Sequence, residues 1–543
     1  GVVGGVVADV ADLGEAQRRE RLADLAPEML AELEAEPEEE EATLPELPDA
    51  EEGEVVMRAA PNPNGPWHLG HARMPAVIGT YKREYDGTFI CRFDDTDPET
   101  KRPDLEAYDA ILDDIEYLGF EPDRVLKASD RLETYYEYAR ELIDLGGAYT
   151  CDLPAEEFSE LKNAGEPSPN RDKEPETVRE EFEAMVDGEY SAGEMVLRVK
   201  TDIEHKNPAL RDWVAFRIVE TPHPREEAAG YRCWPMLDFQ SGIDDHLTGV
   251  THIIRGIDLQ DSAKRQQFVY DYFGWEYPEV LHWGHVQIDE YDVKLSTSTI
   301  KELIEAGELT GWDDPRAPTL ASVRRRGIRG KAIVDAMTGL GMSTSDVDLA
   351  MSTVYANNRE LVDDEADRYF LVRDREAQPA LKVPVWGGDA GGEGGGETPA
   401  VGSPPLHPEH EGRGRREIPV GDAVLVEADD LPDAGERVWL KGFGCVRYQS
   451  GEGEEAARRN GSFVPTGDDI AAVRKENVPV IHWVPAAGGV DVRMRTPDGD
   501  VRGVAEPDFA GTDVDELLQF ERVGFVRVDE HAEGESIVYY AHP

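Results

Sequence analysis

The sequence is poor in cysteine and in long apolar runs, and each shortage counts against a class of protein. Its four cysteines, Cys91, Cys151, Cys233 and Cys445, stand too far apart to form CxxC pairs, so neither a zinc knuckle nor a disulfide framework is indicated. No apolar run approaches the roughly 18 residues of a membrane-spanning helix. We therefore expect a cytoplasmic protein with no bound metal of its own and no membrane partner.

Positive charge is the second shortage. Lysine and arginine number 56 against 114 aspartates and glutamates, and only 14 of the basic residues are lysine, so the net charge at pH 7 is −58. Because salt at about 1 M screens charges beyond about 3 Å, this composition predicts adaptation to high salt. An acidic disordered protein is the alternative, but 40% of the residues are hydrophobic and periodic segments run along most of the chain. Such acidity taken alone argues against a nucleic-acid partner.

Residues 54–73 carry the most informative pattern in the chain. The apolar run Val55–Met57 predicts a strand, and a proline-rich loop and a helix follow it. His68 and His71 stand three apart in the first helical turn, where unpaired N–H groups and the helix dipole favour an anion. Gly70 has no Cβ, so a bulky ligand can approach the backbone. The pattern favours a nucleoside-triphosphate site; the alternative is a pair of surface or capping histidines.

A second strand is predicted at Thr88–Phe93, and the helix between the two strands makes a parallel βαβ unit. The carboxylates of Asp94, Asp95 and Asp97 follow this strand directly. Ligands of open parallel sheets bind at the carboxyl edge, so we expect these carboxylates beside the His-x-Gly-His loop. A capped turn leading into the next helix is the alternative reading. Helices are predicted next at 103–119 and 130–146.

The hydrophobic pattern divides the rest of the chain into segments. Short polar helices interrupt the strand pattern after residue 152, and from 371 onward apolar residues alternate with period two between Gly and Asp turns. The Gly- and Pro-rich segment Gly387–Gly414 is predicted to be a mobile loop. The predicted segments are 1–53, an N-terminal helical appendage and acidic linker; 54–151 and 231–298, two halves of one sheet; 152–230, an insertion; 299–370, a helical region; and 371–543, β-barrels.

Residues 61–72, Pro-Asn-Pro-Asn-Gly-Pro-Trp-His-Leu-Gly-His-Ala, resemble the HIGH signature of class I aminoacyl-tRNA synthetases. Residues 54–543 resemble the glutamyl-tRNA synthetases of the archaeal, salt-adapted type, within the glutamyl/glutaminyl subgroup. Further support comes from RFDDTDP at 92–98, LRDW at 210–213 and DHLTGVTHIIRG at 245–256. The resemblance implies an α/β fold: a class I Rossmann-like parallel sheet split by an acceptor-stem insertion, then a helical domain and C-terminal antiparallel anticodon-binding β-barrels.

The resemblance also implies a reaction. The carboxylate of L-glutamate attacks the α-phosphorus of ATP, bound with Mg²⁺, and gives glutamyl-adenylate and pyrophosphate; a ribose hydroxyl of the terminal adenosine of tRNA(Glu) then attacks the acyl carbon. This chemistry needs alignment and charge stabilisation rather than a protein nucleophile. Archaeal members of the family often charge tRNA(Gln) as well, with a tRNA-dependent amidotransferase correcting the product, so we expect these partners too.

Roles follow from the resemblance position by position. It implies that His68, His71 and Lys294 act on the phosphates and that Arg58, Asp94 and Arg255 bind glutamate. Arg58 matches the arginine whose forked guanidinium grips a substrate carboxylate, and Asp94 matches the acidic residue that receives the substrate ammonium. Glutamine-specific members carry a small uncharged residue in place of Arg255. For Arg58 the alternative is a surface arginine, and for Arg255 it is a structural salt bridge.

The ATP-binding set that the resemblance implies is Pro61, Asn62, Pro63, Asn64, Gly65, Pro66, Trp67, His68, Leu69, Gly70, His71, Lys294, Leu295 and Ser296. The candidate tRNA contacts are Arg324, Arg325 and Arg326, with helix solubility as the alternative.

Two positions depart from the family pattern. Leu237 stands where a tyrosine usually contacts the amino acid, and Thr297 replaces the second lysine of the KMSKS loop, here Lys294–Ser298. Three other functions therefore stay open. A glutaminyl-tRNA synthetase conflicts with Arg255, a degenerate tRNA-binding protein conflicts with the retained motif residues, and a small-molecule nucleotidyltransferase leaves the insertion and the barrels unexplained.

Overall fold

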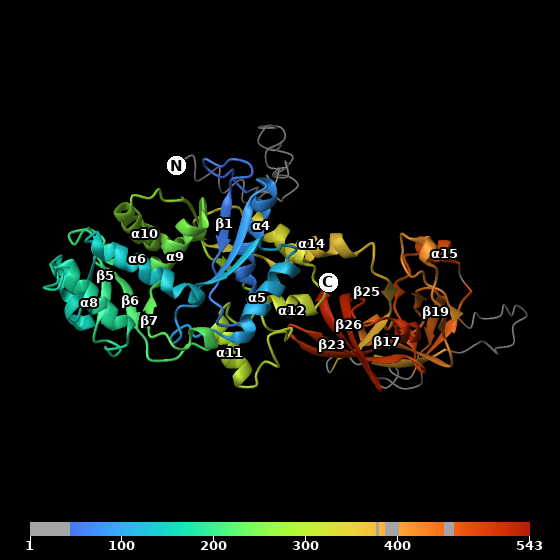
Figure 1. Cartoon of the computed structure of the whole chain (residues 1–543). Coiled ribbons are helices and arrows are strands. Elements are labelled where there is room, and N and C mark those ends of the chain that lie inside the picture. Colours follow the sequence, from blue (N-terminus) through green and yellow to red (C-terminus); the bar gives the residue numbers. More distant parts are fainter. Residues whose placement is uncertain (1–43, 376–379, 386–400, 450–460, 468) are drawn as a thin grey trace, which may run out of the picture.

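The computed structural model describes residues 44–375, 380–385, 401–449, 461–467 and 469–543. These residues form an elongated molecule, with the insertion at one end, the barrels at the other and a parallel sheet between them (Figure 1). The helix predicted in the first 43 residues and the part of the Gly387–Gly414 segment up to residue 400 lie outside the described residues.

A five-stranded parallel sheet forms the centre of the molecule. Its order β3-β2-β1-β8-β9 reverses direction between β1 and β8, and such a switch point is where open parallel sheets bind ligands. The strand β1 pairs with β2 from Val56 opposite Thr88, which confirms the predicted βαβ unit. The strands are β1 (Val56–Ala59), β2 (Thr88–Phe93), β3 (Arg124–Lys127), β8 (His252–Gly256) and β9 (Glu279–Trp283).

Helices that pack on this sheet carry the apolar faces that the spacing predicts. Val77, Ile78 and Tyr81 of α4 are fully buried against β1 and β2, in a core that α13 and α14 of the helical region share. The helices are α4 (Arg73–Glu84), α5 (Leu105–Tyr117), α6 (Leu132–Asp144), α9 (Leu237–Thr248), α10 (Gln260–Phe273), α11 (Thr297–Glu305), α12 (Leu320–Arg325), α13 (Gly330–Gly339) and α14 (Met351–Val362).

The insertion has an antiparallel sheet of its own, in the order β4-β5-β6-β7, with a separate apolar core. Its first and last strands lie just outside the predicted limits of 152 and 230, so the insertion includes both flanks. The last strand of this sheet ends at Pro235, and α9 begins at Leu237. The elements are β4 (Ala148–Cys151), α7 (Ala155–Ala164), α8 (Pro175–Val186), β5 (Val196–Val199), β6 (Val214–Ile218) and β7 (Cys233–Pro235).

The C-terminal part consists of strands that pair mainly antiparallel around two apolar cores, as the period-two pattern predicts. The sheet nearer the helical region contains β12 (Arg368–Tyr369), β25 (Leu517–Phe520), β26 (Gly524–Ala532), β27 (Glu535–His542), β23 (Val490–Thr496), β24 (Gly499–Ala505) and β13 (Leu371–Asp374). The other core lies between the sheets of β14 (Ala380–Pro384), β17 (Ala423–Glu427) and β22 (Val484–Pro485), and of β20 (Ser462–Pro465), β19 (Gly444–Gln449), β18 (Arg437–Leu440) and β21 (Val480–Ile481). Among the described helices, none has the length and apolarity that crossing a bilayer requires.

Candidate active site

Two stacked imidazoles stand where the proline-rich loop enters the helices. His68 is the residue before a short 3-10 helix, Leu69–Ala72, that continues into α4, and its ring centroid lies 3.8 Å from that of His71. Any side chain at Gly70 would place a Cβ 3.1 Å from His68 Cε1, so glycine makes room for the stack. Burial lowers the pKa of His68 to about 4, and burial together with His68 lowers the pKa of His71 well below its ordinary value. Both rings are therefore neutral near pH 7 and can each donate one N–H to a phosphate oxygen.

One cavity of about 1120 Å³ brings the predicted groups together. Arg58, Asp94 and Arg255, from the ends of three neighbouring strands, line it together with both histidines and Lys294. Of the predicted ATP set, the residues that line the cavity are Pro61, Asn62, His68, Gly70, His71, Lys294 and Leu295. The others, which do not line it, are Pro63, Asn64, Gly65, Pro66, Trp67, Leu69 and Ser296.

Packing explains why residues of the second group do not line the cavity. Trp67 and Leu69 belong to the apolar core, with exposures of 2% and 0%. Ser296 begins α11, and its hydroxyl accepts a hydrogen bond from the N–H of Thr299. These residues shape the loop from behind. The sequence pattern could not separate them from the lining residues, because both kinds of residue occur within the same two motifs, 61–72 and 294–298.

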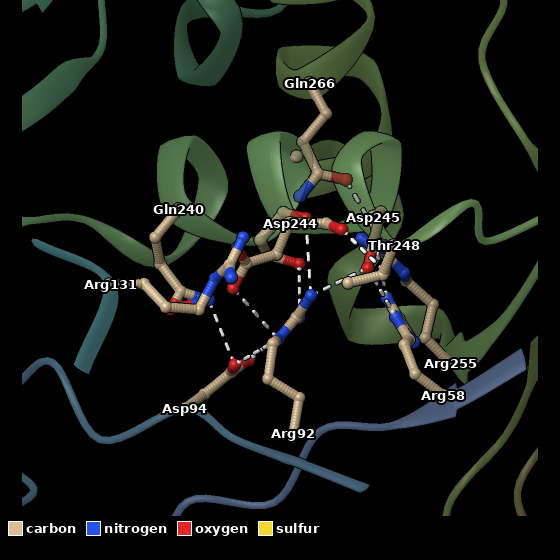
Figure 2. A network of polar contacts seen from close by, with 12 residues as sticks. Arg58, Arg92, Asp94, Arg131, Gln240, Asp244, Asp245, Thr248, Arg255 and Gln266 are labelled. Carbon is tan, nitrogen blue, oxygen red and sulfur yellow. Dashed lines mark hydrogen bonds and ion pairs between the residues drawn. The ribbon is translucent and has the colours of Figure 1, made fainter. Parts of the chain in front are cut away.

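Asp245 of α9 ties two of the buried arginines together. It accepts hydrogen bonds from Arg58 Nε at 3.0 Å and Nη2 at 3.2 Å, and from Arg92 Nη1 at 2.8 Å (Figure 2). Burial opposes the charge of Asp245, but Arg58 and Arg92 together outweigh it and hold its pKa below the ordinary value. Arg58 is 5% exposed, so the alternative of a surface arginine is wrong.

Asp94 lies beside the proline-rich loop, as the sheet-edge argument predicts. Its N–H donates to the Pro61 carbonyl at 2.9 Å, and Asn62 Nδ2 donates to the Asp94 carbonyl at 2.9 Å. Its carboxylate accepts from Arg92 Nε at 2.7 Å and from Gln240 Nε2 at 2.9 Å. Burial nonetheless raises the pKa of Asp94. The capped turn occurs three residues later, where Asp97 accepts from the N–H groups of residues 99 and 100.

Arg255 is the least satisfied of the buried cations drawn in Figure 2. Its Nη2 donates to Gln266 Oε1 at 3.2 Å and stands 3.9 Å from Asp245 Oδ2, while its buried Nε has no hydrogen-bond partner. Burial and the neighbouring Arg58 lower the pKa of Arg255. A structural salt bridge was the alternative role for Arg255. Its only close carboxylate among the described residues, Asp245, is 3.9 Å away and is already bound by Arg58 and Arg92.

A count of charge gives the same result. The labelled residues of Figure 2 include four arginines, at 58, 92, 131 and 255, against three aspartates, at 94, 244 and 245. Arg131 pairs with Asp244 at 2.6 Å, and Arg58 and Arg92 pair with the other two carboxylates. Among these seven residues one positive charge is left over, and it belongs to Arg255, at the wall of a cavity that Asp97, Asp238 and Asp258 also line. A buried charge without a partner is costly, so this site favours an anionic ligand group.

The two departures from the family pattern can now be located. Thr297 is 8% exposed, and a Cβ built on Gly65 would lie 2.7 Å from its Cγ2, so its side chain faces the signature loop. Lys294 is exposed and lines the cavity. Leu237 also lines the cavity, with an exposure of 41%. The loop therefore offers one lysine to the cavity.

The predicted tRNA contacts need a correction. Arg326 is fully buried and donates to the carbonyls of Tyr540 and Ala541, at 2.9 and 2.6 Å. Arg325 pairs with Asp313 at 2.7 Å and with Asp529 at 2.9 Å. Both arginines join α12 to the last barrel. The prediction of a phosphate contact is wrong for the buried Arg326, whereas Arg325 is partly exposed and its contact with tRNA stays a prediction. Arg324 is exposed, and its contact with tRNA stays a prediction.

The sequence analysis missed the residues that support the site: Arg92, Gln240, Asp245 and Gln266. Asp245 lies in the string 245–256, but nothing there marked it as a partner of arginine. The helix α9 is buried on all sides from Asp238 to Asp245 despite its polar residues, so helical periodicity gave no signal.

Comparisons with known proteins agree with this architecture. The family described as "tRNA synthetases class I (E and Q), catalytic domain" matches residues 54–364, and its anti-codon binding domains match 366–461 and 480–529. Glutamate--tRNA ligase of Haloarcula marismortui is 67% identical over all of this chain and 91% of its own length. The Methanosarcina acetivorans protein of the same name is 45% identical over 99% of this chain and 90% of its own. A solved glutamate tRNA ligase from Elizabethkingia meningosepticum is 19% identical, with a TM-score of 0.39, over 57% of this chain and 71% of its own.

Proposed function

This chain belongs to the class I tRNA synthetases of the glutamate and glutamine group, and on that premise we propose that it is a glutamate–tRNA ligase that selects its amino acid through Arg255. The observation that carries the proposal is the excess charge of Arg255 in the cavity that also contains His68 and His71. A γ-carboxylate would neutralise this guanidinium with two charge-assisted hydrogen bonds, whereas the amide of glutamine would leave it unpaired.

The remaining residues fit the two steps of the reaction. In this proposal Asp94, which follows β2 directly and lines the cavity, receives the ammonium of glutamate. Arg58 has five N–H donors, of which Asp245 accepts from Nε and from Nη2, so others remain for a substrate carboxylate. The α-carboxylate attacks the α-phosphorus of ATP, pyrophosphate leaves, and a ribose hydroxyl of the tRNA then displaces AMP from the acyl carbon.

The phosphate end of the cavity works by electrostatics rather than by covalent chemistry. The two imidazoles are already neutral, so no proton has to leave before they donate their N–H groups to the phosphates from the start of the helix. Lys294 adds a mobile cation at the cavity wall. Mg²⁺ enters as part of the ATP substrate, and its charge adds to that of Lys294 on the triphosphate.

The test is ATP–pyrophosphate exchange with tRNA present, in molar KCl because of the net charge of −58. Exchange should depend on glutamate and should be far weaker with glutamine. A stronger response to glutamine would favour a glutaminyl-tRNA synthetase. Exchange at background with both amino acids, together with retained tRNA binding, would instead favour a tRNA-binding protein that no longer activates an amino acid.

The choice of tRNA is a finer proposal. We propose that the enzyme charges tRNA(Gln) in addition to tRNA(Glu) and that a tRNA-dependent amidotransferase takes up the mischarged product; the archaeal resemblance alone supports this. Purified tRNA(Gln) offered with labelled glutamate tests it, with tRNA(Glu) as the positive control. No incorporation into tRNA(Gln) alongside full charging of tRNA(Glu) would remove this proposal and leave the ligase assignment intact.

A further inference from the structure

Gln266 of α10 is the hydrogen-bond partner of the arginine that faces the substrate. Its side chain is 1% exposed and lines the same cavity, and Figure 2 shows it reaching from the helix toward Arg255. Its Oε1 accepts two hydrogen bonds, from Arg255 Nη2 at 3.2 Å and from the hydroxyl of Tyr277 at 2.6 Å. The site thus has a second layer that the sequence analysis did not anticipate.

Arg255 determines how the amide of Gln266 is turned. If the amide were flipped, its NH₂ group would face a guanidinium that has no acceptor, and the hydrogen bond from Arg255 would be lost. Burial raises the pKa of Tyr277 to about 12, so this hydroxyl keeps its proton at any working pH. Tyr277 therefore holds the oxygen of Gln266 toward Arg255.

The neutrality of Gln266 is the feature that matters for selection. A glutamate at this position would have nearly the same shape and would also accept from Arg255, but its charge would cancel that of the guanidinium. The nearest aspartate, Asp245, stands 3.9 Å away and is engaged by Arg58 and Arg92, so it leaves the charge of Arg255 largely free. An uncharged acceptor can orient an arginine while preserving its attraction for a ligand carboxylate.

We propose that Gln266, held by Tyr277, is a positioning residue that sets the preference for an acidic over an amide side chain by orienting Arg255 without neutralising it. This inference rests on the proposed function. Tyr277 acts through Gln266 rather than on the substrate, so it does not replace the hydroxyl that Leu237 lacks.

The experiment compares Gln266→Glu with Gln267→Glu, which adds the same charge to the next residue of α10, where the side chain is exposed. Both variants are assayed by exchange with glutamate and with glutamine, and the ratio of the two kcat/KM values is the readout. Gln266→Glu should lower this ratio at least about tenfold, mainly through the KM for glutamate, while Gln267→Glu leaves it unchanged. A purely structural role would lower both kcat/KM values by the same factor.

Gln266→Met and Tyr277→Phe complete the test. Gln266→Met removes the acceptor and keeps the volume, so it should raise the KM for glutamate about tenfold with little change in kcat. Tyr277→Phe should shift the ratio in the same direction by about twofold to fivefold, and it provides the readout if Gln266→Glu does not fold. An unchanged ratio in Gln266→Glu, or in Tyr277→Phe where only that variant folds, would overturn the inference. Absence of glutamate-dependent exchange in the unaltered protein would overturn the proposed function instead.

Discussion

Two of the buried arginine–carboxylate clusters in the described residues make an instructive comparison, because only one of them has the character of a binding site. In the barrels, Arg416 is 2% exposed, with Nε 3.1 Å from Glu506 Oε1 and Nη2 3.6 Å from Glu521 Oε1. Its guanidinium lies 4.7 Å from the ring of Phe370. Lys441 also pairs with Glu521, so Arg416 and Lys441 match the two carboxylates in number, whereas in the cluster around Asp245 the arginines outnumber the carboxylates.

The comparison shows what distinguishes a binding arginine from a structural one. Arg416 and Arg255 are both deeply buried, so burial alone does not separate them. Arg416 has two carboxylates beside it and an aromatic ring over it, while Arg255 has a neutral acceptor, a distant shared aspartate and a cavity. A guanidinium marks a ligand site when its charge is not neutralised by the protein and it faces a cavity.

The largest effect should come from removing the arginine of the cavity. Arg255→Ala deletes the group that pairs with the substrate carboxylate, and truncating one partner of a buried charge pair costs about 2–5 kcal/mol, or roughly 30- to 5000-fold. We expect kcat/KM for glutamate in exchange to fall by about a thousandfold. The melting temperature should hardly change, because Arg255 has no close carboxylate to leave unpaired. Unchanged use of glutamate would contradict the assignment of the pocket.

Removing the arginine of the barrels should produce the opposite pattern. Arg416→Met leaves Glu506 without its buried cation, while Glu521 keeps Lys441, so the free energy of unfolding should drop by about 3–5 kcal/mol through Glu506. Exchange activity per folded molecule should stay within about twofold of the unaltered protein. Denaturant titration in KCl, followed by exchange on the folded fraction, measures both. Loss of activity in parallel with Arg255→Ala would show that the two clusters are not independent.

A smaller effect should distinguish two lysines near the phosphate end of the cavity. Lys294 lines the cavity, whereas Lys301, seven residues later on α11, is exposed and does not. Lys294→Ala should lower the exchange rate by about 10- to 100-fold, with a higher KM for ATP, because it removes a cation near the triphosphate. Lys301→Ala is the matched control and should change neither value. Equal effects in both variants would mean that the net charge of the region matters and the position of Lys294 does not.

The sequence predicted the site best where a motif residue lies at the carboxyl end of a predicted parallel strand. Arg58 and Asp94 lie at or just after the ends of adjacent parallel strands, and Arg255 lies near the end of a third, so sheet topology and motif together predicted that they line one cavity. The helix from Leu69, the second strand at Thr88–Phe93 and the alternating barrels were confirmed for the same reason: each has a clear period.

The parts that were missed depend on tertiary contacts. Nothing in the local sequence shows that Gln266 meets Arg255, since eleven residues and a change from strand to helix separate them. The run Arg324–Arg326 looked like a basic surface, but α12 ends against β27 and the carbonyls there take up Arg326. A pattern of charge cannot distinguish an arginine that awaits a phosphate from one that already binds backbone oxygens.

The two regions should also respond to acid at different pH values. His68 has a pKa near 4 in the folded protein and near 6.5 when unfolded, so between these values only the unfolded chain takes up the proton, and stability falls as the pH drops from 6.5 to about 4. Burial alone would raise the pKa of Glu521, but His482 and Lys441 hold it at about 2, so its contribution is complete above 4.5 and is lost as the pH falls from 4.5 to about 2. His68→Gln should therefore flatten the upper part of the stability curve, and Glu521→Gln the lower part, in denaturant titrations at constant KCl. If His68→Gln kept the full slope between pH 6.5 and 4, the imidazole would not be buried as a neutral group, and its role as an N–H donor to the phosphates would have to be abandoned.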